Sequence, residues 1–550
     1  MNAFFIFIEN KLIMQKLTFL LLVLITASCS KKEQADLIVT NANIYTVNDY
    51  FETAQAFAVK DGKFLEVGTT KDILAKYEAS NIEDVNGQTI VPGFIDAHCH
   101  FLGLGLNQLA VDLVGTTSFE EVVQRVTDFQ NKKNLNFIKG RGWDQNDWDV
   151  KEFPNNKLLN ALFPDTPIVL TRIDGHAILC NQAALDLGNV TIESKIDGGE
   201  VVTIDGELTG VLVDNAESLV LSYWPGVLKN DIVKALMDAQ DICFSYGLTT
   251  VDDAGLGIDA IEIIDSLQQS GDLKMRVYAM VSATKRNLDY YLNKGIVKTD
   301  KLNVRSFKFY ADGALGSRGA MLREPYSDKP GHFGLMVNSI KTMEETASRI
   351  ANSEFQMNTH AIGDSANHIV IQTYKEVLKG KSNRRWRIEH AQVVSPEDFE
   401  LFDDIIPSVQ PTHATSDMYW AEDRVGAERI KGAYAFKDLL NKYGKIALGT
   451  DFPVEFVSPF YTFYAAVARQ DLKGYPDEGY QMENALTREE TLKGMTIWAA
   501  YSNFEEDVKG SIETGKFADF IILDKNIMEV NASGIPNIKV VKTFVDGEAQ

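Results

Sequence analysis

The chain has 550 residues, of which 45% are hydrophobic and 24% are charged, as in an ordinary globular protein. Its formal net charge of −23 argues against nucleic acid and against an anionic membrane surface as partners, because binding to either needs basic residues that neutralise phosphate. The length predicts more than one domain, or one large barrel with a smaller companion.

The first segment is typical of an export signal. A lysine precedes the apolar run 17–27, which is shorter than the roughly twenty residues of a bilayer-spanning helix. Small residues then lead to Cys29 in a pattern that resembles a bacterial lipobox. We expect residues 1–28 to be a signal peptide, with translation starting at Met1 or Met14, and Cys29 to carry lipid; a plain cleaved signal is the alternative. The protein would then be exported and lipid-anchored to the bacterial membrane, in the periplasm or at the cell surface.

Three further cysteines, Cys99, Cys180 and Cys243, are too few for a disulfide framework in a chain of this length.

Residues 29–90 contain short β-rich runs, with Asp61-Gly62 as a hairpin signal. Residues 506–550 contain similar short β-rich runs. Both ends of the chain therefore predict strands, and we expect them to form one small composite β-sandwich.

Between these ends, over residues 91–505, short apolar strands alternate with helical stretches, which is the pattern of a parallel sheet. Eight candidate strands follow in order: TIVPGFIDAHCH, GLTTVDDAG, MRVYAMVSA, VRSFKFYADG, FQMNTHAIGD, RWRIEHAQ, IIPSVQPTH and IALGTDFPV. Eight such units predict an α/β fold with a (β/α)8 TIM-like barrel, whose functional residues lie at the carboxyl ends of the strands.

A large insertion, over about residues 102–246, separates the first two barrel strands. A connection of this length needs structure of its own, and we expect it to cover the barrel mouth. Its aromatic-rich loop GRGWDQNDWD contains Trp143 and Trp148. We interpret Trp143 as a substrate contact at the mouth, and the alternative is that both tryptophans form the core of the insertion.

Two histidines one residue apart end the first barrel strand. In VPGFIDAHCHF, His98 and His100 occupy positions i and i+2, whose side chains point to the same face of an extended strand. Two imidazoles on one face are able to bind one ion. Cys99 lies between them and is expected to point to the opposite face, into the core.

Further candidate ligands end later strands: Lys308, His360, His390 and Asp451. Each taken alone is commonly a structural residue, but together they recur at the same end of successive strands. Imidazole and carboxylate ligands suit Zn²⁺ and related divalent ions. The sequence therefore predicts a metal centre, and it leaves open whether one or two ions are bound.

The segments PGFIDAHCH, FKFYADGALGSRGA, HAIGD, IEHAQ and GTDFPV resemble the metal-dependent amidohydrolase superfamily. Within it they resemble the branch of YtcJ-like proteins and N-substituted formamide deformylases, amidohydrolase family 3, over residues 37–546. The resemblance implies metal ligation by the histidines and by Asp451, which would also be catalytic. It implies that Lys308 is open to carboxylation to an N6-carboxylysine that bridges two metals; a hydrogen-bonding role or a single-metal role is the alternative.

The resemblance and its chemistry together predict hydrolysis of a non-peptide carbon–nitrogen bond in a small molecule, an N-substituted amide or formamide. A divalent ion lowers the pKa of bound water to about 7, which supplies hydroxide at neutral pH. Asp451 would act as general base and then as general acid towards the leaving nitrogen. Further substrate contacts are expected from His176, from Arg318 (or a structural salt bridge there) and from His413, whereas His332 and His368 are expected to be structural.

Other functions remain open on the same residues. The scaffold also suits ester or cyclic-amide hydrolysis, deamination or isomerisation, because a fold does not determine a reaction. A non-catalytic binding lipoprotein is the alternative from another class, although a binding module has no need of Asp451. The oligomeric state is not encoded in any recognisable pattern, and a homodimer stays open.

Overall fold

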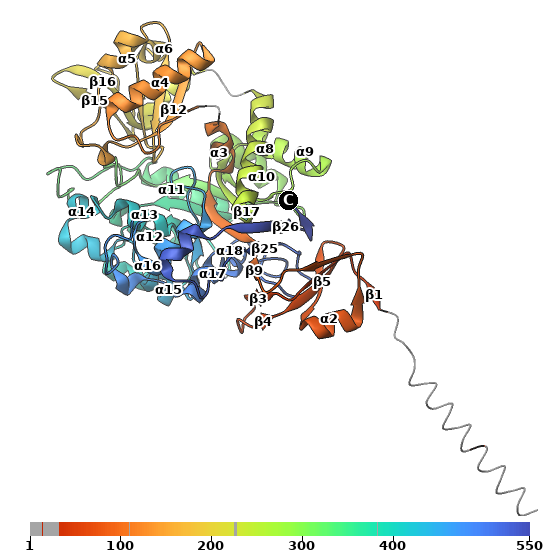
Figure 1. Cartoon of the computed structure of the whole chain (residues 1–550). Coiled ribbons are helices and arrows are strands. Elements are labelled where there is room, and N and C mark those ends of the chain that lie inside the picture. Colours follow the sequence, from red (N-terminus) through yellow and green to blue (C-terminus); the bar gives the residue numbers. More distant parts are fainter. Residues whose placement is uncertain (1–13, 15–31, 109, 225–227, 382) are drawn as a thin grey trace, which may run out of the picture.

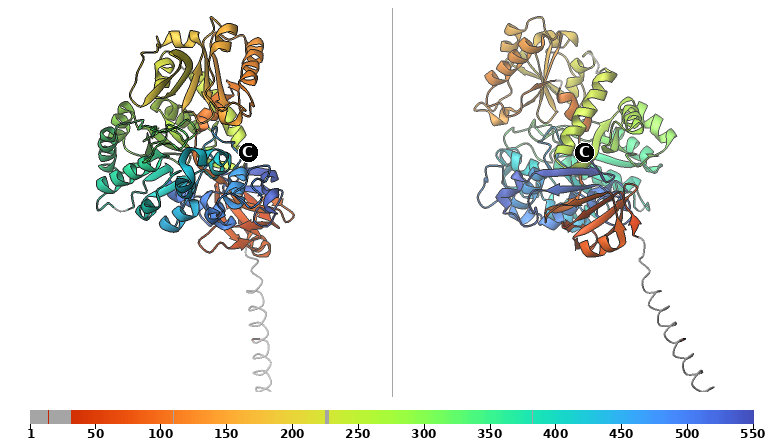
Figure 2. Two further views of the ribbon diagram at one scale, coloured as in Figure 1. Left: turned by 90° about the vertical axis from the view of Figure 1, so that its left-hand side faces the viewer. Right: turned by 45° about the vertical axis from the view of Figure 1, so that its right-hand side comes forward.

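The computed structural model describes residues 14, 32–108, 110–224, 228–381 and 383–550. The signal peptide expected over 1–28, Met14 apart, and the lipidation expected at Cys29 lie outside the described residues. The rest forms a central barrel, a β-sandwich and an inserted α/β unit (Figure 1). The insert and the sandwich lie on opposite sides of the barrel in both further views (Figure 2). None of the helices in the described part of the chain has the length and apolar character that crossing a membrane requires.

The barrel consists of eight parallel strands that neighbour one another in chain order. They are β10 (Phe94–Cys99), β17 (Leu248–Leu256), β18 (Arg276–Ser282), β20 (Leu302–Tyr310), β21 (Gln356–Ala361), β22 (Arg387–His390), β23 (Ile406–Val409) and β24 (Ala447–Leu448). The end of the last strand returns to the first, because the N–H of Asp451 donates to the carbonyl of His98 at 2.8 Å. The (β/α)8 prediction is confirmed.

Amphipathic helices cover the outside of the barrel. In α11 (Ile340–Ala351), Ser339 caps the first turn by accepting from the N–H of Thr342, and the buried side chains recur at helical spacing from Met343 to Ile350. Other helices between barrel strands are α8 (Lys229–Ser245), α9 (Ile258–Ser270), α10 (Lys285–Lys294), α12 (Asp364–Val377), α13 (Pro411–Asp417), α14 (Ala421–Arg429) and α15 (Phe436–Tyr443). After β24 come α16 (Pro459–Ala468), α17 (Arg488–Gly494) and α18 (Ile497–Ser502).

The two ends of the chain build the β-sandwich together. One sheet has the order β6-β5-β2-β8 and the other β27-β26-β25-β9-β3-β4. Phe57 and Phe520 come from the two ends of the chain and lie in the same apolar core, with ring centroids 4.8 Å apart. The bounds are β2 (Leu37–Thr40), β3 (Asn43–Tyr45), β4 (Thr53–Ala54), β5 (Ala56–Lys60), β6 (Lys63–Gly68), β8 (Asn81–Asp84), β9 (Thr89–Pro92), β25 (Phe520–Leu523), β26 (Val540–Val545) and β27 (Glu548–Ala549).

The segment expected to form the first barrel strand is in fact two strands. β9 belongs to the sandwich and β10 to the barrel, and Gly93 separates them. A side chain at Gly93 would collide with Thr249, so glycine allows the chain to pass closely over β17 as it leaves the sandwich. The break at Gly93 was not predicted from the sequence, because the apolar run continues on both sides of it.

The insert between β10 and β17 has a six-stranded sheet with the order β11-β12-β13-β14-β16-β15. Its elements are β11 (Val111–Asp112), α4 (Phe119–Lys133), β12 (Ile138–Trp143), α5 (Lys157–Leu162), β13 (Ile168–Arg172), β14 (Ala177–Cys180), α6 (Gln182–Leu187), β15 (Gly199–Ile204), β16 (Glu207–Asp214) and α7 (Ser218–Leu221). Helix α3 (Phe101–Asn107) leads from β10 into the insert, and α8 leads back to the barrel (Figure 1).

Candidate metal centre

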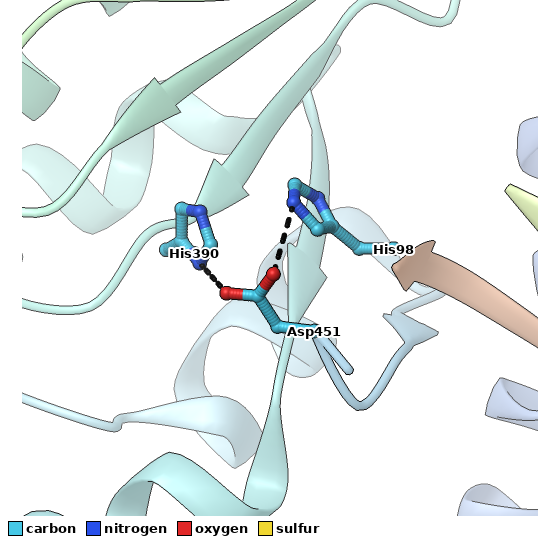
Figure 3. Close-up of side chains that lie close together, drawn as sticks. All are labelled: His98, His390 and Asp451. Carbon is cyan, nitrogen blue, oxygen red and sulfur yellow. Dashed lines mark ion pairs between the residues drawn. The ribbon is translucent and has the colours of Figure 1, made fainter. Parts of the chain in front are cut away.

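The six residues expected to form a site meet at the carboxyl ends of the barrel strands. His98 lies in β10 and His100 directly after it. Lys308 lies in β20, His360 in β21, His390 at the end of β22 and Asp451 after β24. All six line one cavity of about 1030 Å³. Figure 3 shows Asp451 between His98 and His390.

Asp451 is at the centre of this arrangement. Its Oδ1 lies 3.2 Å from His100 Nε2 and 3.7 Å from His98 Nε2, and its Oδ2 lies 4.0 Å from His390 Nδ1. The ligand atoms of Asp451, His98 and His390 lie within 4.8 Å of one another. The backbone of Asp451 has φ +62° and that of His390 has φ +75°, conformations that non-glycine residues seldom adopt and that concentrate at functional sites.

Lys308 and His360 complete the group. The Nζ of Lys308 lies 3.0 Å from His98 Nε2, and the ring of His360 lies 4.5 Å from that of His390, centroid to centroid. His360 and Lys308 are both buried. Lys308 thus lies against His98 within the same buried group of side chains.

Two neighbours orient the histidines. Glu389 Oε2 lies 2.6 Å from His98 Nδ1, and Gln410 Oε1 lies 2.8 Å from His390 Nδ1. The carboxylate of Glu389 holds the proton of His98 on Nδ1 and leaves the Nε2 lone pair facing Asp451 and Lys308. Neither residue was expected from the sequence. Glu389 carried one signal, since a carboxylate in a buried barrel strand needs a partner.

Burial sets the protonation of the basic groups. It lowers the pKa of His98, with the Lys308 charge acting in the same direction, and it lowers the pKa of His360 and His390 well below the ordinary range. These imidazoles are therefore neutral at pH 7, the form in which histidine binds metals. Burial also lowers the pKa of Lys308 to about 8.

The acid at the centre is ionised. Burial acts to raise the pKa of Asp451, but the His100 imidazole and the other nearby histidines outweigh it and hold this pKa well below its ordinary value. Asp451 Oδ1 is buried and lies 3.2 Å from His100 Nε2. A buried carboxylate beside imidazole nitrogens fits a divalent cation in both charge and donor type.

Two expected substrate contacts also face this cavity. His413 lies in α13 rather than at the end of β23, with its Nε2 3.8 Å from Asp451 Oδ2. His176 comes from the insert, and its ring lies 5.2 Å from that of His360. Burial opposes the charge of His176, but the hydrogen bond between its Nδ1 and Asp214 Oδ1, 2.7 Å long, raises its pKa to about 9.

The other two expected contacts are corrected by the structure. Trp143 has no exposed surface, packs beside Trp148 in the core of the insert and donates from Nε1 to the carbonyl of Leu170 at 2.7 Å. Arg318 forms a salt bridge with Asp328 at 3.0 Å and is not among the residues that line the cavity. For both residues the structural alternative is the correct one.

The histidines expected to be structural lie away from the centre. His332 Nε2 is 2.9 Å from the carbonyl of Arg318, and His368 Nδ1 is 2.9 Å from Asp398 Oδ1. Cys99, Cys180 and Cys243 are buried free thiols. Cys99 is packed in the barrel core, as the alternation of the strand predicts.

The insert forms one wall of the cavity, together with apolar residues of the barrel. Arg141, Arg172 and Asp174 line it from the insert, and Tyr246 and Phe456 line it from the barrel. The sequence analysis attached no role to Arg141, although an arginine between two glycines at a strand end is an unusual arrangement.

The fold and this set of residues define the class of the protein: a parallel barrel with a metal-binding centre at the carboxyl ends of its strands. Comparison with known proteins gives the family. The model of the amidohydrolase family matches residues 81–549, and the chain belongs to this family. It is a metal-dependent hydrolase that acts on carbon–nitrogen bonds.

The relatives match over nearly their whole length. The amidohydrolase-like protein YtcJ of Bacillus subtilis is 30% identical over 92% of this chain and 97% of its own. The N-substituted formamide deformylase of Arthrobacter pascens is 25% identical over 94% of this chain and 98% of its own. A solved structure of an uncharacterized metal-dependent hydrolase from Pyrococcus horikoshii has a TM-score of 0.74 and 28% identity, covering 90% of this chain and 99% of that one.

Proposed function

We propose that the protein hydrolyses an N-substituted amide or formamide of a small molecule at this centre. The observation that carries the proposal is the buried carboxylate of Asp451, whose oxygens lie 3.2 to 4.0 Å from ring nitrogens of His98, His100 and His390. The similarity to a named N-substituted formamide deformylase over nearly the whole chain supports the substrate class.

The metal would be held by residues from five of the barrel strands. His98, His100 and Asp451 form one set of donors, His360 and His390 a second, and a carboxylated Lys308 would contribute oxygen to both. Zinc suits imidazole and carboxylate donors, and the two sets accommodate one or two ions. When bound, a divalent ion supplies Lewis-acid polarisation of the scissile carbonyl and acidifies a water molecule.

The protein's own groups supply the proton transfers. Asp451 is ionised, so its carboxylate is able to accept the proton of the attacking water and to return it to the departing nitrogen. An amide requires this second transfer, because an unprotonated amine anion is a poor leaving group. Residues of the insert, among them His176 and Arg141, line the cavity beside these groups.

The direct test is a panel of N-formyl and N-acyl amines, with matched esters and cyclic amides, offered to zinc-loaded protein. We expect turnover of at least one N-substituted amide or formamide, loss of turnover after chelation and recovery after zinc is returned. Turnover confined to esters or cyclic amides would show that the substrate belongs to one of those classes and is not an N-substituted amide or formamide. Binding of amides without any turnover by the loaded protein would favour the non-catalytic alternative.

We also propose that the protein is exported and attached to the bacterial membrane only through lipid on Cys29. The short apolar run and the small residues before this cysteine support the proposal. Expressed in a Gram-negative host with labelled fatty acid, the protein should take up label and sediment with membranes, and Cys29→Ser should abolish both. Label retained by Cys29→Ser would exclude the anchor.

A further inference from the structure

Arg141 is a cation in the cavity wall that forms no salt bridge with any of the described residues. It lies at the carboxyl end of β12, and its guanidinium donates one hydrogen bond, from Nη2 to the carbonyl of Ile173 at 2.7 Å. Its Nε is buried without a hydrogen-bond partner among the described residues. A guanidinium carries five N–H donors in a planar fork, so most of this donor capacity is unused.

The neighbouring strand provides a direct contrast. Arg172 ends β13, next to β12, and lines the same cavity. Its guanidinium is fully engaged, because it forms salt bridges with Asp144 and Asp174 and donates from Nε to Gln145 Oε1 at 2.9 Å. Among the described residues, the two carboxylates closest in sequence to these arginines therefore form salt bridges with Arg172, and Arg141 forms none, although the charge of Asp174 also acts on it.

The surroundings of Arg141 keep its guanidinium accessible. Gly175 has φ +76°, and a Cβ at this position would approach Arg141 Nη1 to 3.3 Å. Glycine thus leaves room beside Nη1 on the cavity side. Burial lowers the pKa of Arg141, whereas the charges of Asp174 and then of Asp451 favour its protonated form. Arg141 and Asp451 line the same cavity, so a small molecule bound there is able to contact both residues.

An unpaired cation in a partly buried wall costs free energy that a bound anion would recover. Arginine is also the side chain whose fork matches the two oxygens of a carboxylate. We propose that Arg141 binds a carboxylate of the substrate, so that the protein acts on N-acylated or N-formylated compounds that carry a carboxylate beside the scissile amide. This inference rests on the proposed function for the assignment of the cavity as the substrate site.

The experiment measures binding, so that a failure of the proposed role of Arg141 is distinguishable from a failure of the proposed hydrolysis. N-acetylphenylalanine and its neutral carboxamide share the amide and the aromatic ring and differ only in the charged group. Their dissociation constants are measured by calorimetry on the zinc-loaded full chain, for the unchanged protein and for Arg141→Met, Arg141→Lys and Arg318→Met. Arg318→Met is the matched control, because it removes an arginine that is already paired outside the cavity lining.

The unchanged protein and Arg318→Met should bind the acid about tenfold or more tightly than the carboxamide, the worth of a charge-assisted arginine–carboxylate contact. Arg141→Met should bind the two probes equally, and Arg141→Lys should keep only part of the preference, because lysine lacks the fork. Equal binding by the unchanged protein would overturn the proposal. So would a preference that persists in Arg141→Met, since the carboxylate would then be held by the metal.

Discussion

The Nε2 of His98 and the Nζ of Lys308 lie 3.0 Å apart, and both side chains are buried. An ammonium beside a metal-binding lone pair would repel a cation and has no lone pair of its own to donate. Burial lowers the pKa of Lys308 to about 8, which makes the neutral amine accessible near neutral pH. The neutral amine is the form that reacts with carbon dioxide, and we propose that Lys308 is carboxylated in the metal-loaded protein.

Replacing Lys308 with alanine should therefore remove metal as well as activity. A short carboxylic acid, such as propionate, supplied with excess zinc should restore part of both, because it replaces the missing oxygen donor. Metal content by atomic absorption and turnover are measured on the same samples. Lys308→Ala protein that keeps its full metal content would show that Lys308 is not a ligand.

The lowered pKa of Lys308 also predicts a pH dependence of stability in the metal-free protein. The folded state loses the proton near pH 8, whereas the unfolded chain keeps it to about pH 10.4. Between these values the unfolded chain binds more protons, so the stability contributed by this residue rises with pH, by on the order of 3 kcal/mol across the window. Urea unfolding at pH 7.5 and pH 10 should show this rise in the unchanged protein. Identical pH dependence in Lys308→Met would contradict the assignment.

The histidine pair at the end of β10 should differ sharply from the structural histidines. Loss of a group behind a ligand commonly costs about 10 to 100-fold in metal affinity or activity, so His98→Ala and His100→Ala should each cost more than this. His332→Ala and His368→Ala should change metal content little, because both contact groups away from the centre. Equal, mild losses in all four variants would exclude the centre as described.

The sequence predicted the barrel and the convergence of the six candidate ligands on one cavity, because both depend on patterns local to each strand. An apolar run followed by histidine, lysine or aspartate is visible residue by residue, and the carboxyl ends of parallel strands necessarily meet. Glu389 and Gln410 were missed because their partners, His98 and His390, are fixed only when the barrel closes. Arg141 was missed because its unpaired charge is a property of the folded insert and not of the loop.

Trp143 was assigned a functional role from the sequence that the structure does not support. An aromatic-rich loop between helices suggested a substrate-binding mouth, but packing against Trp148 and the insert sheet buries the side chain completely. Trp143→Ala should therefore lower the free energy of unfolding by about 3 to 5 kcal/mol, the usual cost of removing a large buried aromatic. Denaturant unfolding measures this loss. Unchanged stability together with a raised KM would restore the interpretation of Trp143 as a substrate contact.

The central claim is that Asp451 moves the proton at a metal centre, and Asp451→Asn tests it most directly. Asparagine keeps the shape of the side chain and an oxygen that is able to bind a metal, but it is unable to accept the proton of the attacking water. Zinc content and amide turnover are measured together on the variant and the unchanged protein. Much of the zinc should remain in the variant, while turnover should fall by about 10² to 10⁴-fold, the usual contribution of general acid–base catalysis. An Asp451→Asn protein that turns over amide at the unchanged rate would show that Asp451 does not transfer the proton.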